Sequence, residues 1–156
     1  MIQHKISQFT FLIVIGSLVL AGVPARANDD SELLSEHETI AVFQGISYRV
    51  CQGRTAACPY RCGGTGNFAI FRITKYLRHS LPSSFGQGKV TEFVCQINDN
   101  MGQKKVPEAV FSKIASLKPG QGVSLSWKQE YVTKHFPGGA TTKMPKVSIT
   151  KLEANG

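Results

Sequence analysis

The stretch at residues 39–52, TIAVFQGISYRVCQ, decides how the rest of the chain is interpreted. It is rich in apolar and β-branched residues, and after Gly45 the residues Ile46, Tyr48 and Val50 alternate with polar neighbours. Alternation with a period of two predicts a half-buried strand. The glycine stands where the alternation becomes ambiguous, so it predicts a bulge or a sharp bend within one long strand.

Four more strands and one helix follow this stretch. The helix is indicated by Pro107 in a first-turn position, by Val110 and Ile114 at helical spacing, and by a stop at Pro119-Gly120. The predicted strands cover residues 68–79, 91–98, 123–134 and 146–152, and the helix covers 107–117. Long loops are expected at residues 53–67 and 135–145, where turn residues gather.

The resulting order, β-β-β-α-β-β, predicts a mainly β fold with one short helix between the third and fourth strands. This layout resembles the OB-fold, a five-stranded Greek-key barrel. The resemblance covers about residues 39–152 and lies in the element order, not in a family signature. It implies a ligand face on strands two and three, flanked by the loops that join strands one and two and strands four and five. An SH3-like or small immunoglobulin-like barrel is the alternative, but neither explains the helix at that position.

The first 27 residues have the pattern of a secretory signal. A polar start is followed by a mostly apolar run at residues 9–23 and by the small-residue box Ala25-Arg26-Ala27. The run is too short to span a bilayer, so no membrane span is expected after cleavage. We therefore expect a periplasmic or secreted protein with a signal at 1–27, a flexible acidic leader at 28–38 and a single domain at 39–156.

The chain has four cysteines, Cys51, Cys58, Cys62 and Cys95. In an oxidising compartment an even set predicts two disulfides, and the sequence does not choose among the three pairings. A zinc or copper site on the same four thiolates is the alternative, because soft metals take four sulfur or imidazole ligands. One disulfide with reactive thiols is a third possibility.

Catalytic patterns are hard to find. After Glu38 only five carboxylates remain, and they are scattered along the chain. No histidine stands near a nucleophile and a carboxylate in a pattern that predicts a triad, and no Cys-x-x-Cys motif is present. We therefore expect a protein that is not an enzyme and that needs no cofactor.

The charge is uneven along the chain. The whole sequence has a net charge of +8, but from Thr39 onward there are 16 basic and 5 acidic residues. Such a balance indicates anionic partners. We expect an anionic polymer or an acidic protein surface; nucleic acid is possible but disfavoured by export. An assembly or scaffold protein of an envelope complex is a further alternative.

The expected ligand face combines charge with aromatic stacking. It draws on the loop after the first strand, on the outer face of the second strand, and on the region between strands four and five. The predicted ligand-binding residues are Arg54, Arg61, Phe68, Arg72, Tyr76, Arg78, Lys134, Lys143 and Lys146.

Overall fold

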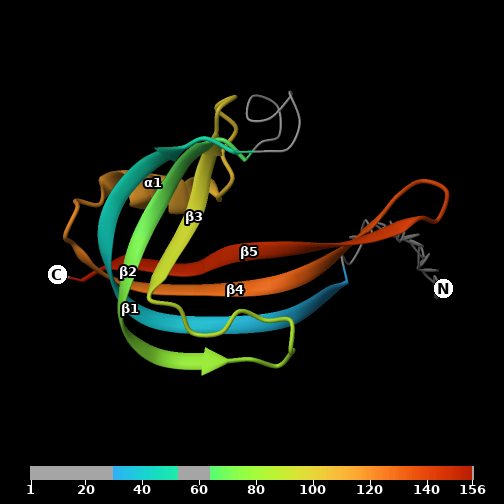
Figure 1. Ribbon diagram of the computed structural model, residues 1–156, viewed down its shortest axis with the longest axis horizontal. Coiled ribbons are helices and arrows are strands. Elements are labelled where there is room, and N and C mark those ends of the chain that lie inside the picture. Colours follow the sequence, from blue (N-terminus) through green and yellow to red (C-terminus); the bar gives the residue numbers. More distant parts are fainter. Residues whose placement is uncertain (1–29, 53–63, 156) are drawn as a thin grey trace, which may run out of the picture.

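The computed structural model describes residues 30–52 and 64–155. The elements follow in the order β1 (Ser31–Arg49), β2 (Gly66–Ser80), β3 (Glu92–Asp99), α1 (Glu108–Ser116), β4 (Gly122–His135) and β5 (Thr141–Ala154). The mainly β composition and the single helix between β3 and β4 confirm the predicted fold class (Figure 1).

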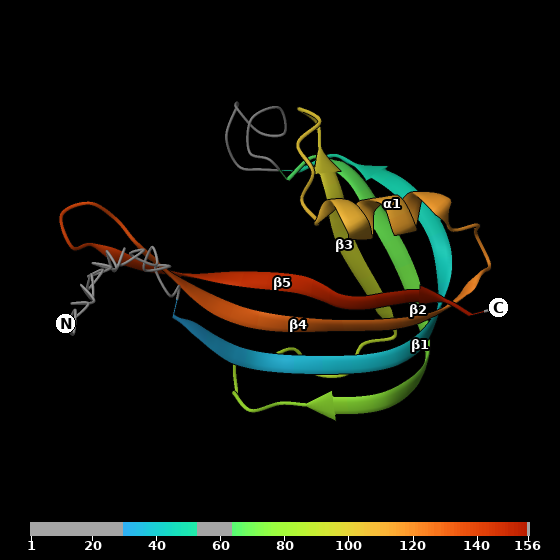
Figure 2. The ribbon, with the colours of Figure 1, turned by 180° about the vertical axis from the view of Figure 1, so that it is seen from behind.

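The five strands form one antiparallel sheet in the order β3-β2-β1-β4-β5. The long strand β1 lies in the middle and pairs with β2 along one edge and with β4 along the other. The sheet bends strongly, and Figure 2 shows α1 lying across the β3 side of the bend. The barrel is loose, because the sheet does not close and leaves β3 and β5 as its two edge strands.

The core occupies the concave side of this bend. Every strand contributes inward side chains to it, and Ile114 of α1 is fully buried among them. The largest members are Phe43 on β1, Phe71 on β2 and Trp127 on β4. The apolar residues whose spacing predicted the helix also pack it against the sheet, with Val110, Phe111 and Leu117 partly buried around Ile114. The other buried members of this core cluster are Ala41, Ala69, Phe93, Ile97, Val123, Leu125 and Leu152.

The predicted bulge in the first strand is confirmed. The pairing of β1 with β2 shifts between Phe43 and Gly45, and Gly45 has a φ of 125°, which side chains with a Cβ rarely adopt. An extra residue here turns the strand, so β1 can serve both halves of the bent sheet.

The first strand begins earlier than the sequence predicts. Residues 31–38, which we expected to belong to a flexible acidic leader, form the first eight positions of β1. Acidic side chains of this part point outward and have basic partners: Glu32 lies 3.0 Å from Lys143, and Glu36 lies 3.4 Å from Arg78. The leader boundary at residue 38 was therefore wrong, because cross-strand charge pairs compensate for the acidic composition.

The expected loop at residues 135–145 is much shorter than predicted. Strand β4 runs to His135 and β5 begins at Thr141, with a tight turn between them. Gly138 and Gly139 supply positive φ angles of 94° and 85° in that turn. Pro145 lies inside β5 and is tolerated there because β5 is an edge strand.

No helix among the described residues is both long enough and apolar enough to cross a membrane. The predicted signal at residues 1–27 lies outside the described residues.

Candidate ligand-binding cleft

The open seam of the sheet holds a cleft of about 560 Å³. One wall is β3 from Glu92 to Gln96, and the other is β5 from Lys146 to Ile149. Residues 105–107, which lead into α1, close one end, and Gln87 borders the cleft as well. A volume of this size falls in the range that small ligands and short peptide segments occupy.

The floor of the cleft is apolar because of the way the two strands are pleated. Phe93 and Cys95 lie opposite Phe71 and Ala69 of β2, so they point to the concave side. On β5, Ile149 lies opposite Trp127, and Val147 is two residues away on the same face. Val147 nevertheless remains 51% exposed. The apolar inner surface therefore continues past the core into an uncovered site.

One end of the seam is closed by hydrogen bonds. The N–H of Lys105 donates to the carbonyl oxygen of Ile97 at 2.9 Å, and Asn98 forms an isolated bridge with Lys104. Lys113 of α1 donates to the carbonyl oxygen of Leu152 at 3.1 Å. These contacts attach residues 104–105 to β3 and α1 to β5.

The facing backbones of the cleft belong to edge strands. Among the strands within residues 30–52 and 64–155, β3 pairs only with β2 and β5 pairs only with β4. An edge strand presents a row of backbone N–H and C=O groups that no neighbouring strand uses. The cleft therefore combines an apolar floor with two walls that can form hydrogen bonds.

The rim of the cleft is mixed in charge. Lys146 stands on the β5 wall and Glu92 on the β3 wall. Lys105 also lines the cleft, and its ammonium lies 2.7 Å from the Asp99 carboxylate, a contact that lowers the pKa of Asp99. Lys146 is therefore the rim cation that is more available to an anionic ligand, since Lys105 already has a carboxylate partner.

Cys95 is a free thiol on the cleft floor. Burial raises the pKa of this thiol to about 12, so it stays protonated at neutral pH and lacks the thiolate that nucleophiles and metal ligands need. A disulfide that includes Cys95 is not formed in the structure. Cys58 and Cys62 lie outside the described residues, so the pairing of the remaining cysteines stays a prediction. Residues 30–52 and 64–155 contain no cluster of three metal-ligating side chains.

Two residues of the predicted ligand face share the outer surface of β2. Phe68 lies opposite Gln96 and Arg72 lies opposite Glu92 of β3. The guanidinium of Arg49, which was not predicted, lies 5.6 Å from the centre of the Phe68 ring. Arg54 and Arg61 lie outside the described residues.

The predicted stacking role of Tyr76 does not fit its position. One shift in the pairing of β1 with β2, which skips Thr74 between Ile73 and Lys75, turns Tyr76 to the inner face, where its hydroxyl accepts from the Val90 N–H at 2.8 Å. Arg78 does lie on the outer face, but it is held by Glu36 and Glu38 at 3.4 and 3.3 Å. Tyr76 therefore belongs to a different face of the sheet from Phe68 and Arg72, and the charge of Arg78 is already balanced.

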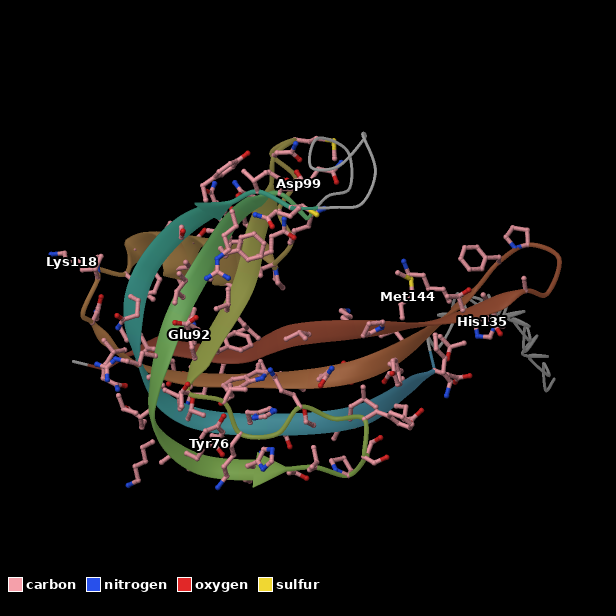
Figure 3. All side chains as sticks on the ribbon, viewed as in Figure 1. Tyr76, Glu92, Asp99, Lys118, His135 and Met144 are labelled. Carbon is pink, nitrogen blue, oxygen red and sulfur yellow. The ribbon has the colours of Figure 1, made fainter. Side chains whose placement is uncertain are left out.

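The three predicted lysines lie on the β4–β5 hairpin and not in a loop. Lys134 and Lys143 are near its tip, the end marked by His135 and Met144 in Figure 3, far from Asp99 at the end of β3. Lys143 is paired with Glu32 at 3.0 Å. Only Lys146 reaches the cleft. The structure thus distributes the predicted residues over two faces and a hairpin tip instead of gathering them.

Apart from Lys146, the residues that line the cleft were not predicted from the sequence as a site. Cys95 was considered only for disulfides or a metal, and Val147 and Ile149 were read as ordinary strand residues. The one available signal was Pro145, because a proline within a strand marks a sheet edge. Nothing in the sequence marks β3 as the opposite edge of the cleft.

The strand order and the cleft define a small protein built on an open, bent antiparallel sheet with a groove at its seam. No protein-family model, curated protein or solved structure matches this chain. Its function therefore has to be argued from the cleft itself.

Proposed function

We propose that the protein is a non-catalytic binding module that holds an anionic ligand or partner segment in the cleft between β3 and β5. The observation that carries this proposal is the uncovered apolar floor at Val147 and Ile149, with the basic residue Lys146 on the same wall of the cleft. A group with an apolar body and a negative charge would bury Val147 and Ile149 and place its charge near Lys146. The basic composition of the whole chain favours the same sign of ligand.

The non-catalytic part of the proposal has support from the chemistry of the cleft. Its lining contains no histidine, and its one thiol is held in the protonated form by burial. Glu92 stands at the rim without a second carboxylate among the lining residues. These groups can bind and orient a ligand, but they offer no base paired with a nucleophile.

The proposal also includes export of the protein and a disulfide that stabilises it. The signal-like pattern at residues 1–27 would deliver the module to the periplasm or the exterior, and a disulfide within Cys51, Cys58 and Cys62 would stiffen the connection between β1 and β2. Intact mass measured with and without reduction, after thiol alkylation, tests this part. We expect one disulfide and two thiols that become alkylated without reduction. A stoichiometric metal bound by four free thiols would contradict the disulfide.

The binding proposal is tested with anilinonaphthalene sulfonate, a fluorescent probe that has an apolar body and one negative charge. We expect the folded protein to bind it, with the strongest nuclear magnetic resonance shifts at Val147, Ile149 and Phe93. Lys146→Gln should weaken binding about three- to fivefold, the effect of losing one partly exposed charge contact. Added salt should weaken binding to the original protein more than binding to the variant.

The matched control is Lys134→Gln. Lys134 lies on the same hairpin but outside the cleft, opposite Thr142, so its loss should leave the affinity unchanged. Equal losses in the two variants, or shifts spread along the outer face of β2, would refute the cleft as the binding site.

A further inference from the structure

The two walls of the cleft run in the same direction. Each neighbouring pair in the order β3-β2-β1-β4-β5 is antiparallel, so β3 and β5 are both parallel to β1. A single extended segment between them can therefore run antiparallel to both walls at once. Antiparallel pairing is the commoner and slightly more stable arrangement.

We infer that the cleft accepts an extended segment of a partner protein as a sixth strand, which bridges β3 and β5 and closes the barrel. This inference rests on the proposed function, because it uses the same cleft and names the class of its ligand. The free walls extend over Glu92–Cys95 on β3 and Lys146–Ile149 on β5. Four residues of strand span roughly 13 Å, so the inserted core of the partner is about four to five residues long.

The pleat of the walls dictates the side chains of the partner. Its inward positions would lie level with Phe93 and Cys95 on one side and with Val147 and Ile149 on the other, so they are apolar. Its outward positions would lie level with Val94 and with Lys146, and the net charge of the chain favours acidic residues there. The segment therefore alternates apolar and acidic residues.

A second copy of this chain fits less well. Its own edges carry the same charge pattern, with Lys146 on one wall, and the whole chain has a net charge of +8. Two β5 edges would bring Lys146 against Lys146, and the net charge opposes the approach of two copies in any pairing, whereas an acidic segment is attracted to the basic chain. We therefore assign the cleft to a different protein.

The test uses a capped seven-residue peptide in which glutamate and valine alternate, with valine at the three inward positions. We expect it to bind, and the backbone amides of both walls to become protected from hydrogen exchange. Two further peptides, N-methylated at alternate residues so that each loses the donors of one edge, should both bind at least about tenfold more weakly.

The protein variant for this test is Val147→Lys, which places a charge on the floor, and its matched control is Val50→Lys. Both valines are about half exposed, 51% and 55%, but Val50 lies beyond the end of β1 and outside the cleft. Val147→Lys should reduce peptide affinity at least about tenfold, and Val50→Lys should leave it unchanged.

The outcomes separate the two proposals. If anilinonaphthalene sulfonate binds with dependence on Lys146 while no peptide binds, strand addition is refuted and the binding cleft stands. If the N-methylated peptides bind as well as the parent, or if only one of them is weakened, a bridging strand is refuted. Protection of both walls that grows with protein concentration alone would assign the cleft to a second copy. Failure of both probes would overturn both proposals.

Discussion

The imidazole of His37 lies flat against the indole of Trp127, with ring centroids 4.3 Å apart and an angle of 6° between the planes. Phe93, on the cleft floor, stacks on the same indole at 4.3 Å. A fully buried histidine thus forms the inner layer of a stack of three rings that ends at the candidate site. The charge state of this histidine therefore bears on the stability of the whole concave face.

The structure predicts that acid destabilises the protein through His37. Burial, with a smaller effect of nearby His79, lowers the pKa of His37 from 6.5 to about 4. Ser35 Oγ lies 3.1 Å from Nε2, whereas Nδ1 has no hydrogen-bond partner among the described residues. Protonation would create a buried N–H without an acceptor. Because the unfolded chain takes up this proton near pH 6.5 and the folded chain resists it until about pH 4, stability falls as the pH falls through that window.

The loss should reach about 3 kcal/mol near pH 4 and should be absent above about pH 7. Urea unfolding across this range measures it. His37→Gln should flatten the fall below pH 6.5, while His135→Gln, at the exposed end of β4, should leave the profile unchanged. A variant at His37 with the full acid sensitivity of the original chain would contradict this assignment.

Tyr76 provides a second prediction, because its hydroxyl fastens a loop and does not stack on a ligand. The hydroxyl accepts from the Val90 N–H at 2.8 Å and lies 3.2 Å from the Val90 carbonyl oxygen, to which it donates. Tyr76→Phe removes both bonds and should lower the free energy of unfolding by about 1–2 kcal/mol.

The control is Tyr48→Phe, since Tyr48 is 58% exposed and should be nearly neutral. Hydrogen exchange at Val90 should become faster in the Tyr76 variant only. Probe binding at the cleft should not change, and a large loss of affinity without a loss of stability would restore the ligand role that the sequence suggested for Tyr76.

The position of Tyr76 shows why the strands could be predicted from the sequence while the faces of some side chains could not. Strands β2, β3 and β4 and the helix α1 follow the predicted spans closely, because their inward residues are apolar at regular intervals. Between Ile73 and Arg78 the pairing with β1 slips by an extra residue of β2 in two places. Each slip turns the following side chains over, so a strict period of two places Tyr76 and Leu77 on the wrong faces.

The first residues of β1 were missed for a different physical reason. The buried positions there include two polar residues, Ser35 and His37; Ser35 Oγ lies 3.4 Å from Gln129 Oε1 and 3.1 Å from His37 Nε2. Polar residues at buried positions interrupt the alternation of apolar and polar residues that predicts a strand. The cleft could not be predicted either. It exists because β3 and β5 do not pair with each other, and no local sequence pattern indicates which strands remain unpaired.

Ile114 provides the third prediction, since it is the only fully buried side chain of the described helix. Ile114→Ala would leave a cavity between α1 and the sheet and should cost roughly 2–5 kcal/mol of stability. The matched control is Ser112→Ala on the exposed side of α1, which should be neutral or slightly stabilising because alanine favours helix. Denaturant unfolding of the two variants measures both changes, and a loss below about 1 kcal/mol for Ile114→Ala would mean that the helix contributes little to the core.

The last prediction concerns the loop between β2 and β3, which crosses β1 at Gly86. A Cβ added at Gly86 would lie 2.0 Å from the carbonyl oxygen of Leu34, a fully buried residue of β1. Backbone atoms cannot move aside as easily as a flexible side chain, so Gly86→Ala has to lift the loop from the strand. Because the next residue, Gln87, donates its N–H to Gln129 Oε1 at 2.9 Å, that contact should be disturbed too.

Gly86→Ala should therefore cost about 1–3 kcal/mol, the usual range for overpacking a tight site. Gly88→Ala is an unusually close control: it lies two residues away in the same loop, and its added Cβ would meet nothing within 4 Å. We expect that variant to be as stable as the original chain or slightly more stable, because alanine reduces the freedom of the unfolded state. Equal melting temperatures for the two variants would show that the loop does not rest on β1. In that case the loop would not stabilise the inner face around His37 and Gln129.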